Sequence, residues 1–187
     1  MPAEWERHDA TWIAWPHQEP DWPGKLEAVR WAYAEIVRVL ATHERVEILC
    51  HSETVRDSAT AMLQAHGVAM QRVNLPLLPT DRVWLRDSGP SFVWNENGEV
   101  EMIAWDFSAW AKYDNFARDR RVPEAIQRIT GLPKTSAIRP DDPARRLVLE
   151  GGGIEVNGQG RILVTEEWLL SDTQVRNPGL TRAGYEE

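Results

Sequence analysis

Apolar residues in the first 75 positions follow two different spacings. One stripe recurs every three or four residues and predicts a helix over about 25–41. A second stripe predicts a helix that begins after Ser52, a favourable N-cap, and ends before Gly67. The short apolar runs around these helices predict strands at 11–15, 46–50 and 68–75. An alternation of strands and helices is typical of an α/β fold.

The pattern changes to hairpins further along the chain. Two apolar segments within 91–105 flank a polar loop, in which Gly98 supplies the positive φ of a tight turn. A helix is predicted over 122–130, and a strand over 146–149 follows it. Two further segments within 154–165 flank a second Asn-Gly loop and predict a second hairpin.

A carboxylate follows an apolar run at two places that precede these hairpins. The run 83–90 predicts a strand that reaches Asp87 and stops at Ser-Gly-Pro, and Glu150, before three glycines, repeats this pattern 63 positions later. We interpret the two stretches as a degenerate repeat, which predicts modules around an axis, as in a propeller, with carboxylates converging at the centre. The alternative is that both are ordinary turns of an α/β sheet, with Asp87 bonding the next backbone N–H groups.

The charge balance indicates the kind of ligand that such carboxylates would hold. Asp and Glu number 29 against 21 Lys and Arg, a net charge of −8, which excludes a basic field for nucleic acid or an anionic membrane. A small cationic substrate fits this sign. No apolar run approaches the roughly 20 residues of a membrane helix, and the first seven residues are too polar for a signal peptide, so we expect a cytoplasmic protein.

The remaining chemistry-bearing residues are few. Cys50 is the single cysteine, and we interpret it as a buried structural thiol. No metal-binding pattern is present, so we expect neither a metal nor a cofactor. Ten tryptophans mostly predict packing, but Trp84, three residues before Asp87, is a candidate to contact an aliphatic cation.

Five ordered motifs resemble those of the agmatine deiminase family, which is grouped with the Porphyromonas-type peptidylarginine deiminases. They are Met1-Pro2-Ala3-Glu4-Trp5-Glu6-Arg7-His8 with Thr11-Trp12-Ile13-Ala14-Trp15-Pro16, Trp84-Leu85-Arg86-Asp87-Ser88-Gly89-Pro90, Trp110-Ala111-Lys112-Tyr113-Asp114-Asn115-Phe116, Leu149-Glu150-Gly151-Gly152, and Leu163-Val164-Thr165-Glu166-Glu167 with Arg176-Asn177-Pro178. Their spread over the whole chain makes the resemblance specific.

The resemblance implies a pentein fold, a five-unit α/β propeller of which residues 1–187 would form a single partial domain. It also implies hydrolysis of agmatine to N-carbamoylputrescine and ammonia, in polyamine synthesis, through a cysteine-linked amidino intermediate. Asp87 would bind the guanidinium, with Glu150 as a second acid of the site. The family's catalytic histidine and cysteine motifs find no match in this chain, so we expect binding carboxylates without the bond-breaking groups and an inactive chain.

Two alternatives stay open at this point. A peptidylarginine deiminase would use the same carboxylates on arginine in a peptide. A non-catalytic guanidine-binding or interaction module would need no nucleophile. About half of a closed propeller would expose the apolar flanks of its terminal units, so we also expect a homo-oligomer.

Overall fold

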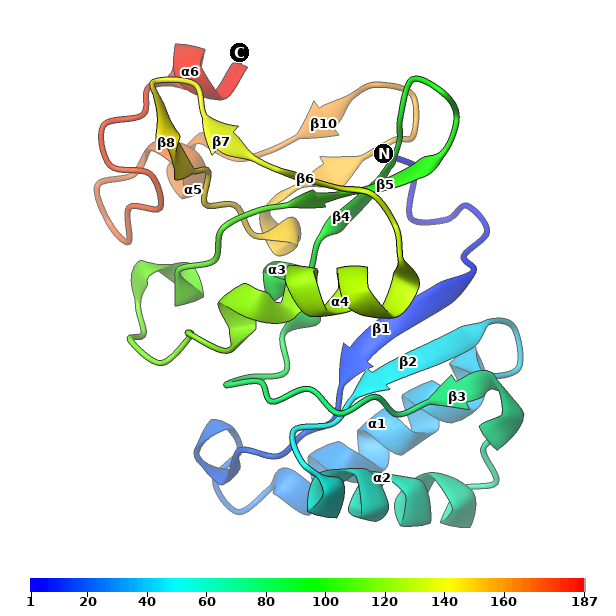
Figure 1. Ribbon diagram of the computed structural model, residues 1–187. Helices are drawn as coiled ribbons and strands as arrows, with labels where there is room; N and C mark the ends of the chain where they lie inside the picture. Colours follow the sequence, from blue (N-terminus) through cyan, green and yellow to red (C-terminus); the bar gives the residue numbers. More distant parts are fainter. Residues whose placement is uncertain (187) are drawn as a thin grey trace. The chain divides into compact units, whose positions relative to one another are not determined.

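The computed structural model describes residues 1–186 and divides into two compact units (Figure 1). One unit comprises residues 7–85. The other comprises residues 1–6 together with 86–187. Within the described residues, no helix is long and apolar enough to cross a membrane.

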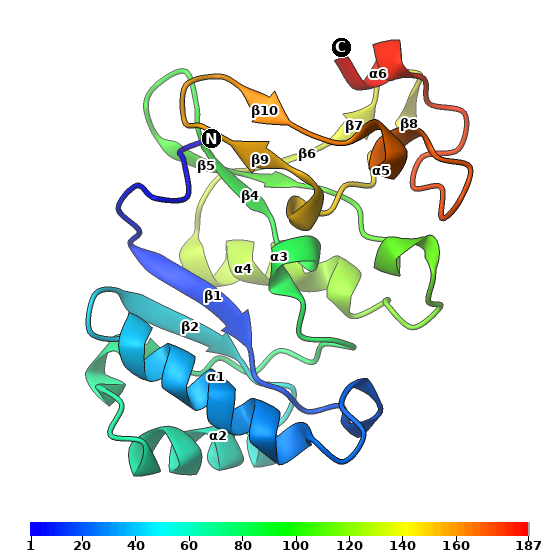
Figure 2. The same ribbon diagram turned by 180° about the vertical axis from the view of Figure 1, so that it is seen from behind.

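The unit of residues 7–85 is a parallel sheet with two helices on one of its faces (Figures 1 and 2). The sheet has the order β1-β2-β3, and the two helices α1 and α2 follow β1 and β2 in the chain. Apolar side chains of both helices meet those of β2 in a buried core. The bounds are β1 (Ala10–Ala14), α1 (Leu26–Leu40), β2 (Arg45–Leu49), α2 (Glu53–Ala65) and β3 (Val73–Asn74).

The local signals of this unit act as the sequence predicts, with one exception. The Ser52 hydroxyl accepts a hydrogen bond from the Val55 amide at 3.3 Å, and Gly67 adopts a φ of +66° beyond the end of α2. The strand predicted over 68–75 is wrong in extent, because β3 has two residues and a 3-10 turn over Met70–Arg72 precedes it. Parallel pairing to β2 is satisfied by those two residues.

The second unit is built from small sheets. An antiparallel hairpin of β4 (Ser91–Trp94) and β5 (Val100–Ala104) is extended by β6 (Lys134–Ser136), which runs parallel to β5. Helix α4 (Val122–Thr130) packs on β5. The remaining elements are β7 (Ile138–Arg139), β8 (Asp142–Arg146), β9 (Glu155–Val156), β10 (Ile162–Leu163), α5 (Glu166–Leu170) and α6 (Arg182–Glu186).

The two hairpins of this unit share one turn design. The Asn95 side-chain oxygen accepts hydrogen bonds from the amides two and four residues later, at 3.0 and 2.9 Å. The Asn157 side-chain oxygen does the same between β9 and β10, at 2.9 and 3.2 Å. The α/β class is confirmed. The strands of residues 1–186 form four separate sheets and no closed one, so the propeller stays an expectation.

Two predicted strands are wrong next to the candidate carboxylates. Asp87 lies in a single helical turn, α3 (Leu85–Ser88), rather than at a strand end. The alternation of buried Val83 and Leu85 with exposed Trp84 imitates a strand pattern, and runs this short are ambiguous.

The strand predicted over 146–149 ends at Arg146 instead. Beyond Arg146 this predicted strand keeps a single parallel bridge, between Val148 and Asp106. The Asn177 amide bonds the other edge of Val148, accepting from its N–H at 3.0 Å and donating to its C=O at 2.8 Å.

Candidate functional site

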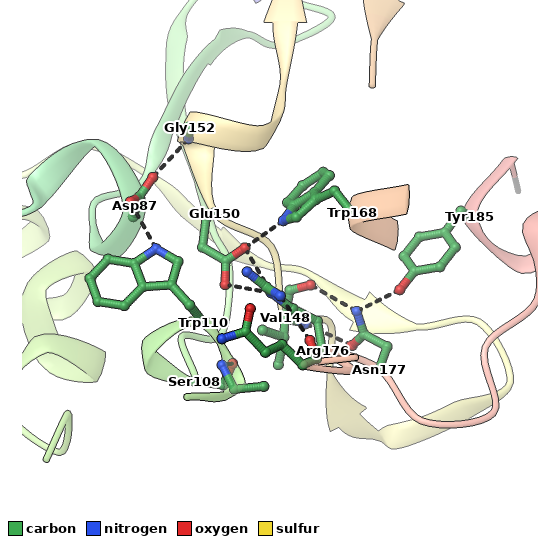
Figure 3. A network of polar contacts seen from close by, with 12 residues as sticks. Asp87, Ser108, Trp110, Val148, Glu150, Gly152, Trp168, Arg176, Asn177 and Tyr185 are labelled. Atoms are coloured by element: carbon green, nitrogen blue, oxygen red, sulfur yellow. Dashed lines mark hydrogen bonds and ion pairs between the residues drawn. The ribbon is translucent and has the colours of Figure 1, made fainter. Parts of the chain in front are cut away.

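The Asp87 carboxylate is held through both of its oxygens (Figure 3). Oδ2 accepts a hydrogen bond from the indole Nε1–H of Trp110 at 3.0 Å. Oδ1 accepts one from the backbone N–H of Gly152 at 2.9 Å. Both donors are neutral, and within residues 1–186 no arginine or lysine forms an ion pair with this carboxylate. Because a carboxylate oxygen can accept two hydrogen bonds, half of the accepting capacity remains.

Trp110 reaches Asp87 from a left-handed turn. Ala109, Trp110 and Ala111 have φ values of +47°, +61° and +50°, although none of them is glycine. This region costs an L-residue roughly 1–2 kcal/mol. The turn is tied at its start, since the Ala111 amide donates to the backbone oxygen and the hydroxyl of Ser108 at 3.0 and 3.2 Å.

The three glycines after Glu150 let three different groups approach closely. A Cβ at Gly151 would lie 2.4 Å from the backbone oxygen of Arg86, and one at Gly152 would lie 2.4 Å from Asp87 Oδ1. A Cβ at Gly153 would lie 2.3 Å from the ring of Trp168. All three distances are below those of real Cβ contacts, so any side chain here would displace its neighbour.

The turn that carries Asp87 is attached by Arg86. Its Nε–H donates to the Gly151 carbonyl at 3.0 Å, and its guanidinium forms an ion pair with Glu4. Arg86 therefore anchors α3 beside the glycines.

Glu150 is buried and already paired. It is 2 % exposed, and its Oε2 accepts from the indole Nε1–H of Trp168 at 2.9 Å. The Arg176 Nε–H lies 3.2 Å from Oε1 and 3.3 Å from Oε2 (Figure 3). A buried carboxylate requires such partners. Its role in contacting a substrate stays a prediction.

Each candidate carboxylate thus accepts a hydrogen bond from an indole further along the chain. Trp110 follows Asp87 by 23 residues, and Trp168 follows Glu150 by 18. Sequence reasoning did not assign either tryptophan to the site. The repeat itself carried the signal, because aligning its two carboxylates also brings the two tryptophans to similar positions.

Trp84, the third candidate, lies in the unit of residues 7–85. The residue is 42 % exposed, and its ring lies tilted against that of Trp22, with centroids 5.8 Å apart. This ring contact explains part of its burial. A role for Trp84 at the site stays a prediction.

Cys50 is unsuited to nucleophilic chemistry, as its interpretation as a structural thiol predicts. It is fully buried, and burial raises its pKa to about 12. Its Sγ donates to the Ile48 carbonyl at 3.5 Å. Among residues 1–186, no three His, Cys, Asp or Glu side chains are grouped to hold a metal ion.

Two histidines stack near this cysteine. The rings of His17 and His51 lie 4.4 Å apart, and both face the Thr80 carbonyl, at 3.2 and 2.8 Å. Burial first, and the neighbouring His51 charge second, lower the pKa of His17, while hydrogen bonds to backbone carbonyls act in the opposite direction.

The fold and the motifs are those of a known family. The model of the Porphyromonas-type peptidyl-arginine deiminase family matches residues 1–187. The chain therefore belongs to this family.

Among its relatives are bacterial agmatine deiminases. Those of Pseudomonas aeruginosa (strain LESB58) and Ectopseudomonas mendocina are 32 % and 34 % identical to it over the whole chain. The solved agmatine deiminase of Enterococcus faecalis is similar with a TM-score of 0.82, at 28 % identity over 100 % of this chain and 48 % of that one.

A substrate-bound agmatine deiminase of C. jejuni shares the fold, with a TM-score of 0.77 at 23 % identity over 97 % of this chain and 49 % of that one. The chain spans 48 % of the length of each of the two Pseudomonas-group relatives.

Proposed function

We propose that this chain supplies the guanidinium-binding part of an agmatine deiminase-type hydrolase, with Asp87 as the carboxylate that holds the substrate. The observation that carries the proposal is that the Asp87 carboxylate is held in place by hydrogen bonds while its charge is not paired within the described residues. Two neutral donors fix its oxygens, its charge has no ion-pair partner within residues 1–186, and its side chain is half-buried. A planar, permanently charged guanidinium matches such a carboxylate.

The proposed reaction converts agmatine and water to N-carbamoylputrescine and ammonia. A cysteine thiolate would attack the guanidinium carbon, ammonia would leave, and water would release the bound amidino group. Asp87 would hold the substrate nitrogens during these steps. Cys50 cannot supply the thiolate, because with a pKa of about 12 it is protonated at neutral pH. The role proposed for Asp87 is therefore to bind the substrate, and the chain alone is expected to be inactive.

Two alternatives share the same carboxylate. A peptidylarginine substrate is suggested by the family's description, whereas the relatives at 32–34 % identity are named agmatine deiminases and favour agmatine. A non-catalytic guanidine-binding module is favoured by the buried state of Cys50. A homo-oligomer and a cytoplasmic location remain part of the proposal.

Isothermal calorimetry with agmatine tests the binding role. Asp87→Asn keeps the shape of the side chain and removes its charge, and a hydrogen bond to a charged group contributes about 1.5–3 kcal/mol, so we expect affinity to fall about tenfold to a hundredfold. Asp57→Asn, on the exposed surface of α2, makes the same charge change elsewhere and is the matched control. Equal affinity of the wild-type chain and Asp87→Asn would refute the proposal.

The two alternatives need separate measurements. Tighter binding of an N-acetylated, amidated arginine than of agmatine would favour the peptidylarginine substrate. Ammonia release by the isolated chain that is lost in Cys50→Ser would contradict both the binding-only assignment and the structural role of Cys50.

A further inference from the structure

We propose that Trp110 is a positioning residue that fixes the plane of the Asp87 carboxylate, so that the site prefers a guanidinium to a simple ammonium. The inference rests on the proposed function of Asp87 and deepens it. Trp110 acts through Asp87, and no contact of its own with the ligand is required.

The geometry of the Asp87 carboxylate supports this role. The terminal torsion of an aspartate is broad, so an untethered carboxylate rotates easily. Here the Trp110 indole holds Oδ2 at 3.0 Å and the Gly152 amide holds Oδ1 at 2.9 Å, which fixes that rotation. A fixed plane favours the planar, forked donor set of a guanidinium, whereas an ammonium is a compact charge without a planar requirement.

The backbone that carries Trp110 is strained. Three consecutive residues without glycine adopt left-handed φ values, and Trp110 is the middle one, with Ser108 tying the turn. Backbone conformations of this kind persist only where the surroundings enforce them, and they cluster at functional sites. The edge of the Phe107 ring packs against the indole, with centroids 5.4 Å apart, and so supports its direction.

The chain contains a second carboxylate that accepts from an indole and already holds a guanidinium. At Glu150, the Trp168 indole donates to one oxygen at 2.9 Å while the guanidinium of Arg176 contacts both oxygens at 3.2 and 3.3 Å. An indole and a guanidinium therefore share one carboxylate in this protein (Figure 3). At Asp87 the Trp110 indole takes the place of the Trp168 indole, and we infer that the guanidinium of the ligand takes the place of the Arg176 guanidinium.

The test compares two cations on the 187-residue chain. Calorimetry gives the dissociation constants of agmatine and of 1,5-diaminopentane, in which an ammonium nitrogen takes the chain position of the guanidinium carbon. Trp110→Phe removes the indole N–H and keeps an aromatic ring. We expect agmatine to bind about tenfold more weakly and the diamine to change much less, so that the preference for guanidinium falls. A loss of folding alone would weaken both ligands equally.

Trp105→Phe is the matched control, because the Trp105 indole donates to a neutral partner, the Ser91 hydroxyl, at 2.9 Å. Its cation preference should equal that of the wild-type chain. If Trp110→Phe does not fold by circular dichroism, Ser108→Ala loosens the same turn without touching Asp87 or Trp110 and should lower the preference in the same direction.

The outcomes separate this inference from the proposed function. An unchanged preference in Trp110→Phe, or in Ser108→Ala where the first variant does not fold, overturns the positioning role. If Asp87→Asn still weakens agmatine binding in that case, the proposed function stands. If Asp87→Asn also binds agmatine as the wild-type chain does, the proposed function itself fails.

Discussion

Replacement of Gly152 by alanine should weaken agmatine binding while leaving the fold nearly intact. The new Cβ would lie 2.4 Å from Asp87 Oδ1, about 1 Å short of ordinary van der Waals contact at 3.4 Å. The backbone of Gly152 has no left-handed φ, so it accepts alanine, and the group that must move is the end of a side chain. Asp87 therefore retreats by about 1 Å and loses its 2.9 Å bond to the Gly152 amide.

The two consequences differ in size. The displaced Asp87 carboxylate would lose a charged hydrogen bond to the ligand, which weakens agmatine binding by about tenfold to a hundredfold. The stability loss is partly offset, because alanine restricts the unfolded chain by about 0.4–1 kcal/mol relative to glycine. We therefore expect the free energy of unfolding to change by only about 1 kcal/mol.

Gly151→Ala is the informative comparison, since its Cβ would meet the Arg86 backbone oxygen at the same distance of 2.4 Å. The Arg86 backbone oxygen cannot rotate away from the new Cβ as a side chain can. Overpacking of this kind lowers the free energy of unfolding by about 1–3 kcal/mol. Urea denaturation followed by circular dichroism measures stability, and calorimetry measures binding. Wild-type affinity in Gly152→Ala, or equal stability losses in the two variants, would refute the reasoning.

Two further predictions concern stability. Ala111 is exposed at a φ of +50°, so Ala111→Gly should raise the free energy of unfolding by about 1 kcal/mol. Ala109→Gly also removes a fully buried methyl group, so its gain in stability should be smaller. No gain in stability for Ala111→Gly would contradict the backbone strain inferred for this turn.

The pKa of His17 is lowered on folding, so below its ordinary pKa of 6.5 the unfolded chain binds a proton that the folded chain binds less readily. Stability contributed by neutral His17 is thus present above pH 6.5 and is lost as pH falls toward the lowered value. Between pH 7.5 and 5.5 the urea midpoint of His17→Gln should fall less than that of the wild-type chain, and equal falls would count against this account.

Much of the fold was predictable because its signals are local. Ser52 and Gly67 delimit α2 through one hydrogen bond and one backbone angle, which depend on neighbours within a few residues. The Asn95 turn carries its own side-chain acceptor in the same way. These interactions join residues that are close in sequence, so the sequence pattern alone is sufficient to predict them.

The sequence singled out two acids as candidates and did not indicate which groups hold them. Asp87 and Glu150 were marked by the repeat, but the donor to Asp87 Oδ1 lies 65 residues away. Arg176, which pairs with Glu150, is 26 residues away. Tertiary contacts of this length depend on how the sheets pack, and spacing along the chain does not encode them.

Glu150 already holds the guanidinium of Arg176, whereas Asp87 holds none from residues 1–186, and this contrast affects the choice of denaturant. Guanidinium chloride unfolds proteins, and at Asp87 its cation would also be a ligand of the folded state. Binding to the folded state alone stabilises it by mass action. Low concentrations of guanidinium chloride would then stabilise the folded chain, and high concentrations would unfold it. A linear extrapolation of the unfolding free energy to zero denaturant would therefore give a wrong stability. Urea, which carries no charge, gives the cleaner reference.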